Sequence, residues 1–342
     1  MEKIAFIDRD GALIYEPEET KQIDSLAKLK ILEGVIPGLK SLLKQGYKLI
    51  MVSNQDGIGT ASFPMKDFEI PQNELLKILK KNKIEFYKIL VCPHLPKDNC
   101  TCRKPKIGLV ASINYDKKTS IMIGDRESDK KFAKNLGVNF IKAETNSRFP
   151  RFAMETRKTK ETQISLALNL DGIGNYNIDT GVGFLNHMLE LFSKHSLIDL
   201  NIKASGDLNV DEHHTTEDIG IVLGRALKKA LGDKKGIRRY GFLLPMDESL
   251  AQVALDVGGR SYLKLDYKPK REFVGDLPTE LLEDFWQAFA DNLSCNLNIK
   301  VIGRNEHHKI EAMFKAVAKS IKMAVENDSR MKNMLPSTKG KL

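Results

Sequence analysis

The sequence lacks any long apolar run, and it lacks a dense block of lysine and arginine with interleaved aromatic residues. A membrane-spanning helix needs about 18 or more apolar residues, so the sequence argues against a membrane protein. Its first residues lead directly into a strand pattern without a signal peptide, and we expect a cytoplasmic protein. The formal net charge of +9 favours anionic small molecules over nucleic acid as partners, although a lysine-rich surface alone also accounts for it.

Cysteine is scarce, with four residues in the chain, three of them within residues 92–102. This distribution is not that of a disulfide framework. Four candidate metal ligands lie in this loop: Cys92, His94, Cys100 and Cys102. Three thiolates and one imidazole make a closed tetrahedral set that suits structural Zn²⁺, with buried free thiols or a redox pair as the alternatives. Because the loop runs directly into Arg103 and Lys104, bound zinc would stiffen the segment that carries this lysine.

The chain of 342 residues is long for one domain, and its hydrophobic content of 42% is typical of a soluble globular protein. We therefore expect two hydrophobic cores. The stretch around Pro150 is charged and shows no sustained periodicity, which is typical of a linker. These observations predict a first domain over residues 1–148, a linker over 149–158 and a second domain over 159–342.

Three short apolar runs in the first domain end on polar residues. Residues 3–7 precede Asp8 and Asp10, residues 48–52 precede Ser53, and residues 120–123 precede a segment with Asp125 and Asp129. Helical stretches separate the runs. This pattern predicts an α/β domain with a parallel sheet, whose site lies along the edge where the strands end.

Four carboxylates would meet at that edge, those of Asp8, Asp10, Asp125 and Asp129. Crowded carboxylates repel each other and take up protons unless a hard cation lies among them, and this oxygen-rich set suits Mg²⁺. With the cation present, Asp8 can stay ionised and attack phosphorus, while Asp10 can protonate the leaving oxygen and later activate water. The sequence therefore predicts a phosphate-ester site.

Two further residues fit this chemistry, because Lys104 would neutralise phosphate charge and Ser53 would hold a phosphate oxygen. Each fragment is weak alone, since Asp-x-Asp and Gly-Asp also occur by chance. Their order and spacing together resemble the haloacid dehalogenase superfamily of phosphatases, which implies a Rossmann-like fold for the first domain.

A motif with two adjacent histidines occurs twice. Residues 211–217 read Asp-Glu-His-His-Thr-Thr-Glu, and residues 305–311 read Asn-Glu-His-His-Lys-Ile-Glu. Each copy opens an amphipathic helical run, on which the glutamate lies one turn from both histidines. One histidine can thus turn toward each of two metal ions, with the carboxylate adding charge. A single pair would also fit a polar helix start, but the recurrence favours metal.

The second domain repeats one plan of elements. A strand over 162–170, a helix over 184–194 with His187 and a strand over 199–204 precede the first histidine motif. Strands over 249–257 and 261–267, a helix over 279–291 and a strand over 296–301 precede the second. This order predicts a duplicated α/β sandwich.

The whole chain, roughly residues 2–342, resembles the family of bifunctional histidine-biosynthesis proteins that join histidinol-phosphate phosphatase to imidazoleglycerol-phosphate dehydratase. In the first domain the resemblance rests on Asp-Arg-Asp-Gly at 8–11, Ser-Asn-Gln-Asp-Gly at 53–57, the cysteine loop followed by Arg-Lys-Pro-Lys, and Gly-Asp at 124–125. In the second it rests on Thr-Lys-Glu-Thr at 159–162, Thr-Gly-Val-Gly-Phe-Leu at 180–185, both histidine motifs, Pro-Met-Asp-Glu at 245–248, and Pro-Ser-Thr-Lys-Gly at 336–340.

The resemblance implies two reactions. The first domain would hydrolyse L-histidinol phosphate through an aspartyl-phosphate at Asp8, with Mg²⁺ held by Asp8, the main-chain carbonyl of Asp10 and Asp129, and with Asp125 beside it. The second domain would dehydrate imidazole glycerol phosphate to imidazole acetol phosphate, using two Mn²⁺ ions that grip the deprotonated imidazole ring.

The resemblance also assigns residues in the second domain. The metal positions are His187, His213, His214, Glu217, Asp284, His307, His308 and Glu311. Glu161 and His195 would lie near the substrate. The phosphate-binding positions are Arg239, Arg260, Lys315, Ser337 and Lys339. Plain surface charge and a disordered tail are the alternatives for this last group.

The chain departs from the family pattern at several positions. Asp284 stands where the family has a metal-binding histidine, Asn186 where an aspartate precedes the metal-binding His187, and Leu191 where a glutamine is expected near the substrate. Ala12 replaces a threonine in the first domain. A carboxylate also binds Mn²⁺, so Asp284 remains a candidate ligand.

Three interpretations remain open at this stage. The chain is an enzyme with two active sites, a working phosphatase whose dehydratase-like domain serves as a metal-dependent assembly scaffold, or a metal-binding protein with neither activity. The intact phosphatase motifs argue against the third interpretation. The family assembles large shells from trimers, so the resemblance also implies a large homo-oligomer.

Overall fold

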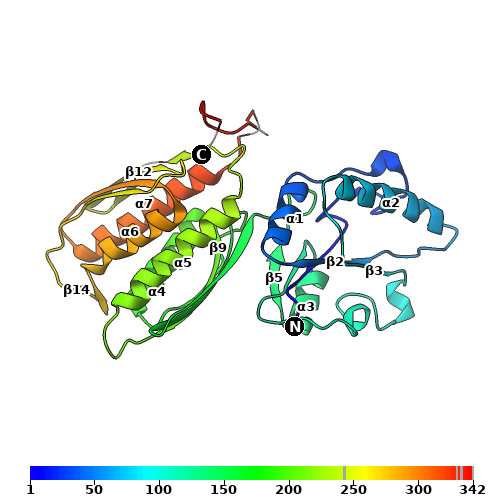
Figure 1. The fold of residues 1–342 in the computed structure, drawn as a ribbon, viewed down its shortest axis with the longest axis horizontal. Helices are drawn as coiled ribbons and strands as arrows, with labels where there is room; N and C mark the ends of the chain where they lie inside the picture. The colour runs from blue at the N-terminus through cyan, green and yellow to red at the C-terminus, as the bar shows by residue number, and fades with distance from the viewer. Residues whose placement is uncertain (242–243, 329, 332–333, 341–342) are drawn as a thin grey trace. The chain divides into compact units, whose positions relative to one another are not determined.

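The computed structural model describes residues 1–241, 244–328, 330–331 and 334–340. It divides into two compact units, Met1–Pro150 and Arg151–Leu342. Within the described ranges, no helix is both long enough and apolar enough to cross a membrane. Figure 1 shows an open sheet with helices in the first unit, and sheets with paired helices in the second.

The linker expected over residues 149–158 is wrong, because most of it is a strand. Strand β6 (Phe152–Lys158) pairs with β7 (Thr162–Asn169) from end to end. It lies at the edge of its sheet, where one face and one side of a strand meet solvent and charged residues are common. The charged residues Glu155, Arg157 and Lys158 hide the strand from a search for apolar periodicity.

The first unit is built on a five-stranded parallel sheet in the order β3-β2-β1-β4-β5. Its strands are β1 (Ile4–Ile7), β2 (Lys48–Asn54), β3 (Lys88–Cys92), β4 (Ile121–Gly124) and β5 (Asn139–Lys142). Every residue of β1 and β4 is buried, as expected for central strands covered on both faces. The predicted parallel α/β fold is confirmed.

Three helices cover this sheet: α1 (Val35–Lys44), α2 (Met65–Lys81) and α3 (Glu127–Leu136). The chain moves from β1 through α1 to β2 in one direction, and from β4 through α3 to β5 in the other. Right-handed crossovers in opposite directions place α1 and α3 on opposite faces. The strand order reverses between β1 and β4, which opens a crevice at their carboxyl ends.

Apart from a two-stranded ribbon, the described residues of the second unit form two sheets with the same topology. The first has the order β6-β7-β9-β8 and the second has the order β10-β12-β16-β13, with β11 also pairing with β12. In each sheet the two middle strands are antiparallel, and the last strand runs parallel to its neighbour. The remaining strands are β8 (Tyr176–Asp179), β9 (Asp199–Gly206), β10 (Tyr240–Gly241), β11 (Leu244–Met246), β12 (Ser249–Asp256), β13 (Tyr262–Asp266) and β16 (Asn296–Ile302). The predicted duplication is confirmed.

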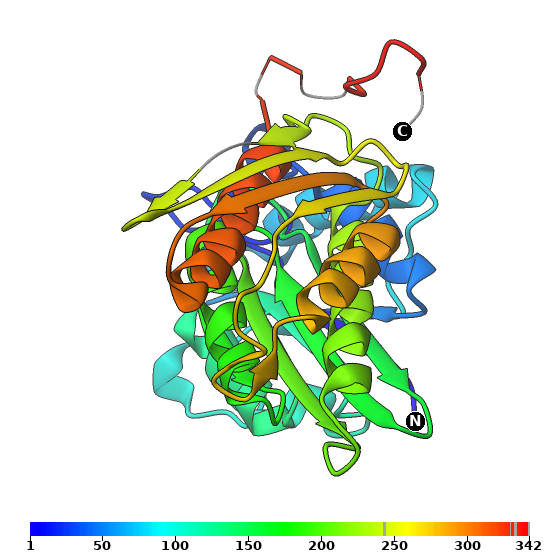
Figure 2. The same ribbon diagram turned by 90° about the vertical axis from the view of Figure 1, so that its left-hand side faces the viewer.

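Two helices accompany each sheet. They are α4 (Gly183–Ser196) and α5 (His213–Leu231) in the first half, and α6 (Leu281–Leu293) and α7 (Glu306–Val325) in the second. Figure 2 shows the helices stacked between the two sheets, with α5 packed against α6 and α4 against α7. A small ribbon, β14 (Phe273–Val274) with β15 (Leu277–Pro278), precedes α6.

Two glycines allow α5 and α6 to approach closely. A Cβ added at Gly220 would lie 2.6 Å from the carbonyl oxygen of Phe285, and one added at Gly224 would lie 2.6 Å from that of Phe289. Heavy atoms do not pack this closely, so only glycine fits. The close approach brings the metal candidates at the start of α5 opposite those on α6.

Replacing Gly220 by alanine should force α5 away from α6 and destabilise the second unit. The overpacking should cost about 1–3 kcal/mol. Urea denaturation followed by tryptophan fluorescence measures this directly, because Trp286 is the chain's single tryptophan and lies fully buried in this unit. Lys228→Ala on the exposed side of α5 is the control, with an expected change within about 0.5 kcal/mol. Equal denaturation midpoints for the two variants would contradict the packing argument.

Candidate active sites and metal centres

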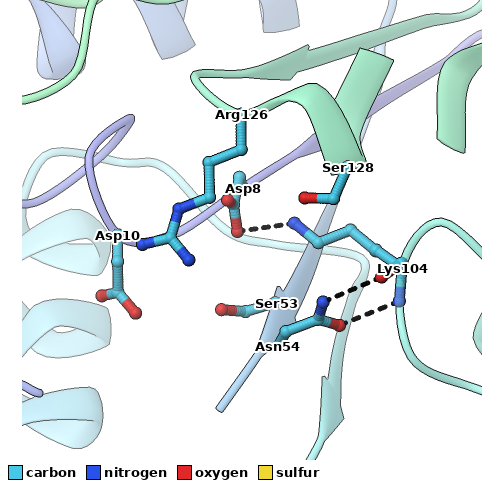
Figure 3. Close-up of a pocket in the computed structure, with 7 residues that line it drawn as sticks. All are labelled: Asp8, Asp10, Ser53, Asn54, Lys104, Arg126 and Ser128. Atoms are coloured by element: carbon cyan, nitrogen blue, oxygen red, sulfur yellow. Dashed lines mark hydrogen bonds and ion pairs between the residues drawn. The ribbon is translucent and has the colours of Figure 1, made fainter. Parts of the chain in front are cut away.

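The crevice of the first unit gathers side chains from three strand ends. Asp8 directly follows β1 and Asp10 lies two residues further on, Ser53 is the second-last residue of β2, and Asp125 directly follows β4. Figure 3 shows Asp8, Asp10, Ser53 and Lys104 around one pocket. Four residues of the expected site, Asp8, Asp10, Ser53 and Lys104, therefore line one pocket, whereas Asp125 and Asp129 are not among its lining residues.

Three of the four predicted carboxylates form a tight group. One oxygen from each of Asp8, Asp125 and Asp129 lies within 4.8 Å of the others, and Asp8 and Asp129 are buried. Burial together with the charge of Asp8 raises the pKa of Asp129 to about 7. Burial also raises the pKa of Asp125, whose buried Oδ1 has no hydrogen-bond partner among the described residues. This donor set fits a hard divalent cation such as Mg²⁺.

The carboxylate of Asp10 lies outside this group. It accepts a hydrogen bond from the amide of Gln55 and lies 3.2 Å from the guanidinium of Arg9. The same Gln55 amide donates to Ser53 Oγ over 2.8 Å, so one side chain ties Asp10 to Ser53. Desolvation raises the pKa of Asp10 despite Arg9, which favours the protonated acid. The expected contact of the Asp10 main-chain carbonyl with a cation stays a prediction.

Lys104 reaches into the centre of the carboxylate group. Its Nζ lies 2.8 Å from Asp8 Oδ1 and 2.6 Å from Asp129 Oδ1. Burial lowers the pKa of Lys104, but the two carboxylates outweigh burial and raise it, so the ammonium form is stabilised. Asn54 fixes the backbone of this lysine, because its side chain accepts from Lys104 N–H over 2.9 Å and donates to Lys104 C=O over 3.2 Å.

Three lining residues were not predicted from the sequence: Asn54, Arg126 and Ser128. The guanidinium of Arg126 pairs with Glu16, and Ser128 lies on the first turn of α3. Both follow β4 within the segment that supplies Asp125 and Asp129. All three residues are polar and lie close to predicted strand ends, which could have marked them as candidates. The sequence could not tell which of these side chains face the pocket.

The four candidate zinc ligands of the cysteine loop come together, with one donor atom each within 4.8 Å of the others. His94 Nδ1 lies 3.2 Å from Cys102 Sγ, and Cys102 Sγ lies 3.3 Å from Cys92 Sγ. Burial raises the pKa of Cys92 to about 12. Burial opposes ionisation of Cys100 too, but hydrogen bonds from Cys102 and two backbone amides lower its pKa to about 7. Three sulfurs and one imidazole nitrogen at these distances fit tetrahedral Zn²⁺.

The cysteine loop is joined to the pocket of the first unit through Arg103. Its guanidinium pairs with Asp56 and donates to the backbone carbonyl of His94 over 3.1 Å. Asp56 lies two residues after Asn54, whose amide holds Lys104. The loop and the segment that carries Lys104 are thus joined to the end of β2.

Six of the eight predicted metal ligands of the second unit form two groups, each across one helix pair. On α4 and α7, the ring centroids of His187 and His307 lie 6.1 Å apart, and His307 Nε2 lies 3.6 Å from Glu311 Oε2. Asp276 fixes the start of α4, because its carboxylate accepts from the N–H groups of Gly183 and Phe184 over 2.5 and 2.8 Å.

The other group lies on α5 and α6. His213 Nδ1 lies 3.9 Å from Asp284 Oδ2, and His213 Nε2 lies 4.0 Å from Glu217 Oε2. Asp284 therefore faces the histidine motif. Three donors in this group do not lie within 4.8 Å of one another in the described structure, and the same holds for the group on α4 and α7. The donor types, imidazole and carboxylate, nevertheless fit a divalent ion such as Mn²⁺.

The second histidine of each motif is held by a carboxylate. His214 Nδ1 lies 3.1 Å from Asp207 Oδ2, and His308 Nδ1 lies 2.8 Å from Glu248 Oε2. These hydrogen bonds raise the pKa of both histidines and lower that of Glu248 to about 2. A carboxylate on Nδ1–H orients the ring with Nε2 available as a ligand. Neither Asp207 nor Glu248 was predicted from the sequence.

The structure gives the departures Asn186 and Leu191 local roles. Asn186 Oδ1 accepts hydrogen bonds from Thr180 N–H over 2.9 Å and from Thr180 Oγ over 2.6 Å. An amide oxygen can accept the same two bonds as a carboxylate oxygen, although more weakly because it carries no charge, so this replacement preserves the bonds that hold the start of α4. Leu191 packs against the hydrophobic core.

The predicted substrate-binding residues lie in several places. Lys315 Nζ lies 2.6 Å from Glu311 Oε1. The pKa of His195 is lowered mainly by burial and further by the positive charges of Lys315 and Lys319. Glu161 ends the turn before β7 and adds charge near His214. Lys315 and His195 thus lie near Glu311 of the α4/α7 group, and Glu161 lies near His214 of the first histidine motif.

Arg239 binds protein groups rather than open solvent. Its guanidinium pairs with Asp256, with Nη2 2.8 Å from Oδ2, and Nη1 donates to the carbonyl of Pro336 over 2.9 Å. The tail that carries Ser337 and Lys339 is thus attached at Arg239. Among the described residues, the side chain of Arg260 forms no hydrogen bond or ion pair with these groups. Phosphate binding by Arg239, Arg260, Lys315, Ser337 and Lys339 stays a prediction.

The chain is similar to known families in both units. The family model for imidazoleglycerol-phosphate dehydratase matches residues 180–321, and that for polynucleotide kinase 3 phosphatase matches residues 3–146. The chain is 47% identical to the histidine biosynthesis bifunctional protein HisB of Legionella pneumophila (strain Lens), with 100% of both chains covered. It is 45% identical to the protein of that name from Spirosoma linguale, with 100% of both covered. The identity to that of Campylobacter jejuni subsp. doylei is 47%, with 99% of both covered.

Replacing Cys102 by serine should remove the zinc from the cysteine loop, because a hydroxyl is a far weaker zinc ligand than a thiolate. Elemental analysis of the gel-filtered chain should show about one zinc per wild-type chain and a small fraction of that in the variant. Cys295→Ser is the matched control, because Cys295 is buried in the second unit and its loss should leave the zinc content unchanged. Equal zinc in all three proteins would contradict the assignment.

Proposed function

Because the chain belongs to the family of histidine biosynthesis bifunctional proteins HisB, it is an enzyme with a phosphatase and a dehydratase activity, and we propose that each activity resides in one of the two units. The two family matches, which cover residues 3–146 and 180–321, support this division. The substrates would be L-histidinol phosphate and imidazole glycerol phosphate. The buried group of Asp8, Lys104 and Asp129 is the observation that carries the phosphatase assignment.

In the phosphatase reaction, a carboxylate oxygen of Asp8 attacks phosphorus and the P–O bond to histidinol breaks. Asp10 donates its proton to the leaving oxygen, in keeping with its raised pKa. Water then attacks the aspartyl-phosphate, Asp10 takes the proton of this water, and phosphate leaves Asp8. Ser53 and Lys104 hold the phosphoryl oxygens and offset their charge.

Mg²⁺ held by Asp8, Asp129 and the Asp10 carbonyl, with Asp125 beside it, would supply positive charge that lets Asp8 stay ionised beside a phosphate. The cysteine loop with Zn²⁺ would have a structural role, because its four ligands leave no open position. Its attachment through Arg103 and Asp56 supports a role in holding Lys104 in place.

In the dehydratase reaction, the substrate loses one proton and one hydroxide to give imidazole acetol phosphate. Two Mn²⁺ ions held by the two ligand groups would act as Lewis acids that stabilise charge on the imidazole ring. Glu161 and His195 would exchange protons with the substrate. Arg239, Arg260, Lys315, Ser337 and Lys339 would bind its phosphate, and the attachment of the tail at Arg239 supports a common site for several of them.

The position of Asp284 supports an active dehydratase over a mere scaffold. Its carboxylate faces His213 at 3.9 Å, where a carboxylate oxygen could bind Mn²⁺ together with the imidazole. His214 and His308 are oriented by carboxylates but belong to neither group of three, so we propose that they complete sites on other copies of the chain. A large homo-oligomer built from trimers, in the cytoplasm, would meet this need.

Separate variants should silence the two activities independently. Asp10→Asn removes the acid and base, and should lower histidinol-phosphate hydrolysis roughly 10²–10⁴-fold without changing dehydration. Glu311→Gln removes a predicted metal ligand and should abolish dehydration without changing hydrolysis. Each variant serves as the control for the other when both reactions are measured by steady-state kinetics. A parallel loss of both activities in either variant would contradict the assignment of one reaction to each unit.

A further inference from the structure

The duplication makes His187 and Asp284 equivalent positions. Helices α4 and α6 occupy the same place in the two halves. In the chain, α4 follows the parallel strand β8 and precedes the middle strand β9, and α6 follows the parallel strand β13 and precedes the middle strand β16. Their sequences align as Leu-Asn-His-Met-Leu at 185–189 and Leu-Glu-Asp-Phe-Trp at 282–286. The first, fourth and fifth residues are buried in both, so the third residues, His187 and Asp284, leave their helices at matching points.

The two ligand groups consequently differ in their donor atoms. The α4/α7 group offers the imidazoles of His187 and His307 and the carboxylate of Glu311. The α5/α6 group offers the imidazole of His213 and the carboxylates of Glu217 and Asp284. Imidazole favours ions such as Zn²⁺ and Ni²⁺, whereas carboxylate favours Mg²⁺ and Mn²⁺.

A second, independent difference acts in the same direction. Lys315 lies one turn after Glu311 and pairs with its Oε1 at 2.6 Å, both side chains being largely buried. The matching position one turn after Glu217 is Ile221, which carries no charge. Glu190 adds a carboxylate 3.9 Å from His187 Nδ1, but Lys315 offsets one of the two negative charges. The α5/α6 group therefore keeps more negative charge than the α4/α7 group.

We propose that the two metal sites of the dehydratase unit are chemically unequal in this chain, with an oxygen-rich site on α5/α6 for hard divalent ions and an imidazole-rich site on α4/α7 for ions that prefer nitrogen. This inference rests on the proposed function, because it takes the two groups as metal sites. Its consequence is stepwise loading, since an ion such as Ni²⁺ fills the α4/α7 site first. Asp284 and Lys315 set the difference.

Calorimetric titration of the chelator-treated full-length chain with Ni²⁺ tests this. The zinc of the cysteine loop is verified by elemental analysis before each titration. The wild type should bind one Ni²⁺ per chain at least roughly tenfold more tightly than a second. In Asp284→His both Ni²⁺ ions should bind with the higher affinity, and in the mirror variant His187→Asp neither should. The wild type, Asp284→His and His187→Asp would thus have one, two and no high-affinity sites per chain.

Two other outcomes would distinguish a wrong inequality between the sites from an absence of metal sites altogether. If all three proteins bind two Ni²⁺ with equal affinity, the sites exist but the inequality is wrong. If none binds Ni²⁺ above the level of a Glu217→Gln/Glu311→Gln double variant, the metal sites and the proposed dehydratase function fail together. Urea denaturation read by Trp286 fluorescence shows whether each variant is folded. Because the two exchanges lie on different helices, opposite shifts in the two variants cannot arise from a common folding defect.

Discussion

Both units must neutralise the negative charge of carboxylates that lie close together. In the first unit these carboxylates lie at the ends of strands, and in the second unit they lie beside histidines near the starts of helices. In the first unit the carboxylates of Asp8, Asp125 and Asp129 meet in a buried crevice, and the raised pKa of Asp129 reflects the unfavourable free energy of holding them ionised without a cation. Lys104 supplies one positive charge. A second cation beside it would let Asp8 remain a nucleophile next to a phosphate.

In the second unit the candidate ligands are brought together twice, because the order of strands and helices is repeated. One βα plan places a histidine motif at the start of α5 and again at the start of α7, and it places a partner ligand on α4 and α6. The glycines of α5 bring α6 close enough for Asp284 to face His213. The two halves have diverged at this position, so a symmetric fold carries an asymmetric set of charges.

Much of both sites could be predicted from the sequence, because strand ends and repeated motifs are local patterns. The parallel sheet, the duplication and the clustering of the cysteine loop all followed from runs and spacings. The strand β6 was missed because its charged residues hide its periodicity. Asn54, Gln55 and Arg126 were missed because their contacts depend on segments that only folding brings together. Glu248 could have been found, since Glu248-Ser249 matches Glu161-Thr162 at the start of the equivalent strand.

We expect the dehydratase unit to be active with a carboxylate, Asp284, in its α5/α6 ligand group. The most direct measurement is the steady-state rate at which the wild-type chain dehydrates imidazole glycerol phosphate as Mn²⁺ is titrated in. Turnover should rise from a metal-free baseline to saturation. A wild-type chain that stays inert at saturating Mn²⁺, while it still hydrolyses L-histidinol phosphate, would contradict an active dehydratase and leave the second unit as a scaffold.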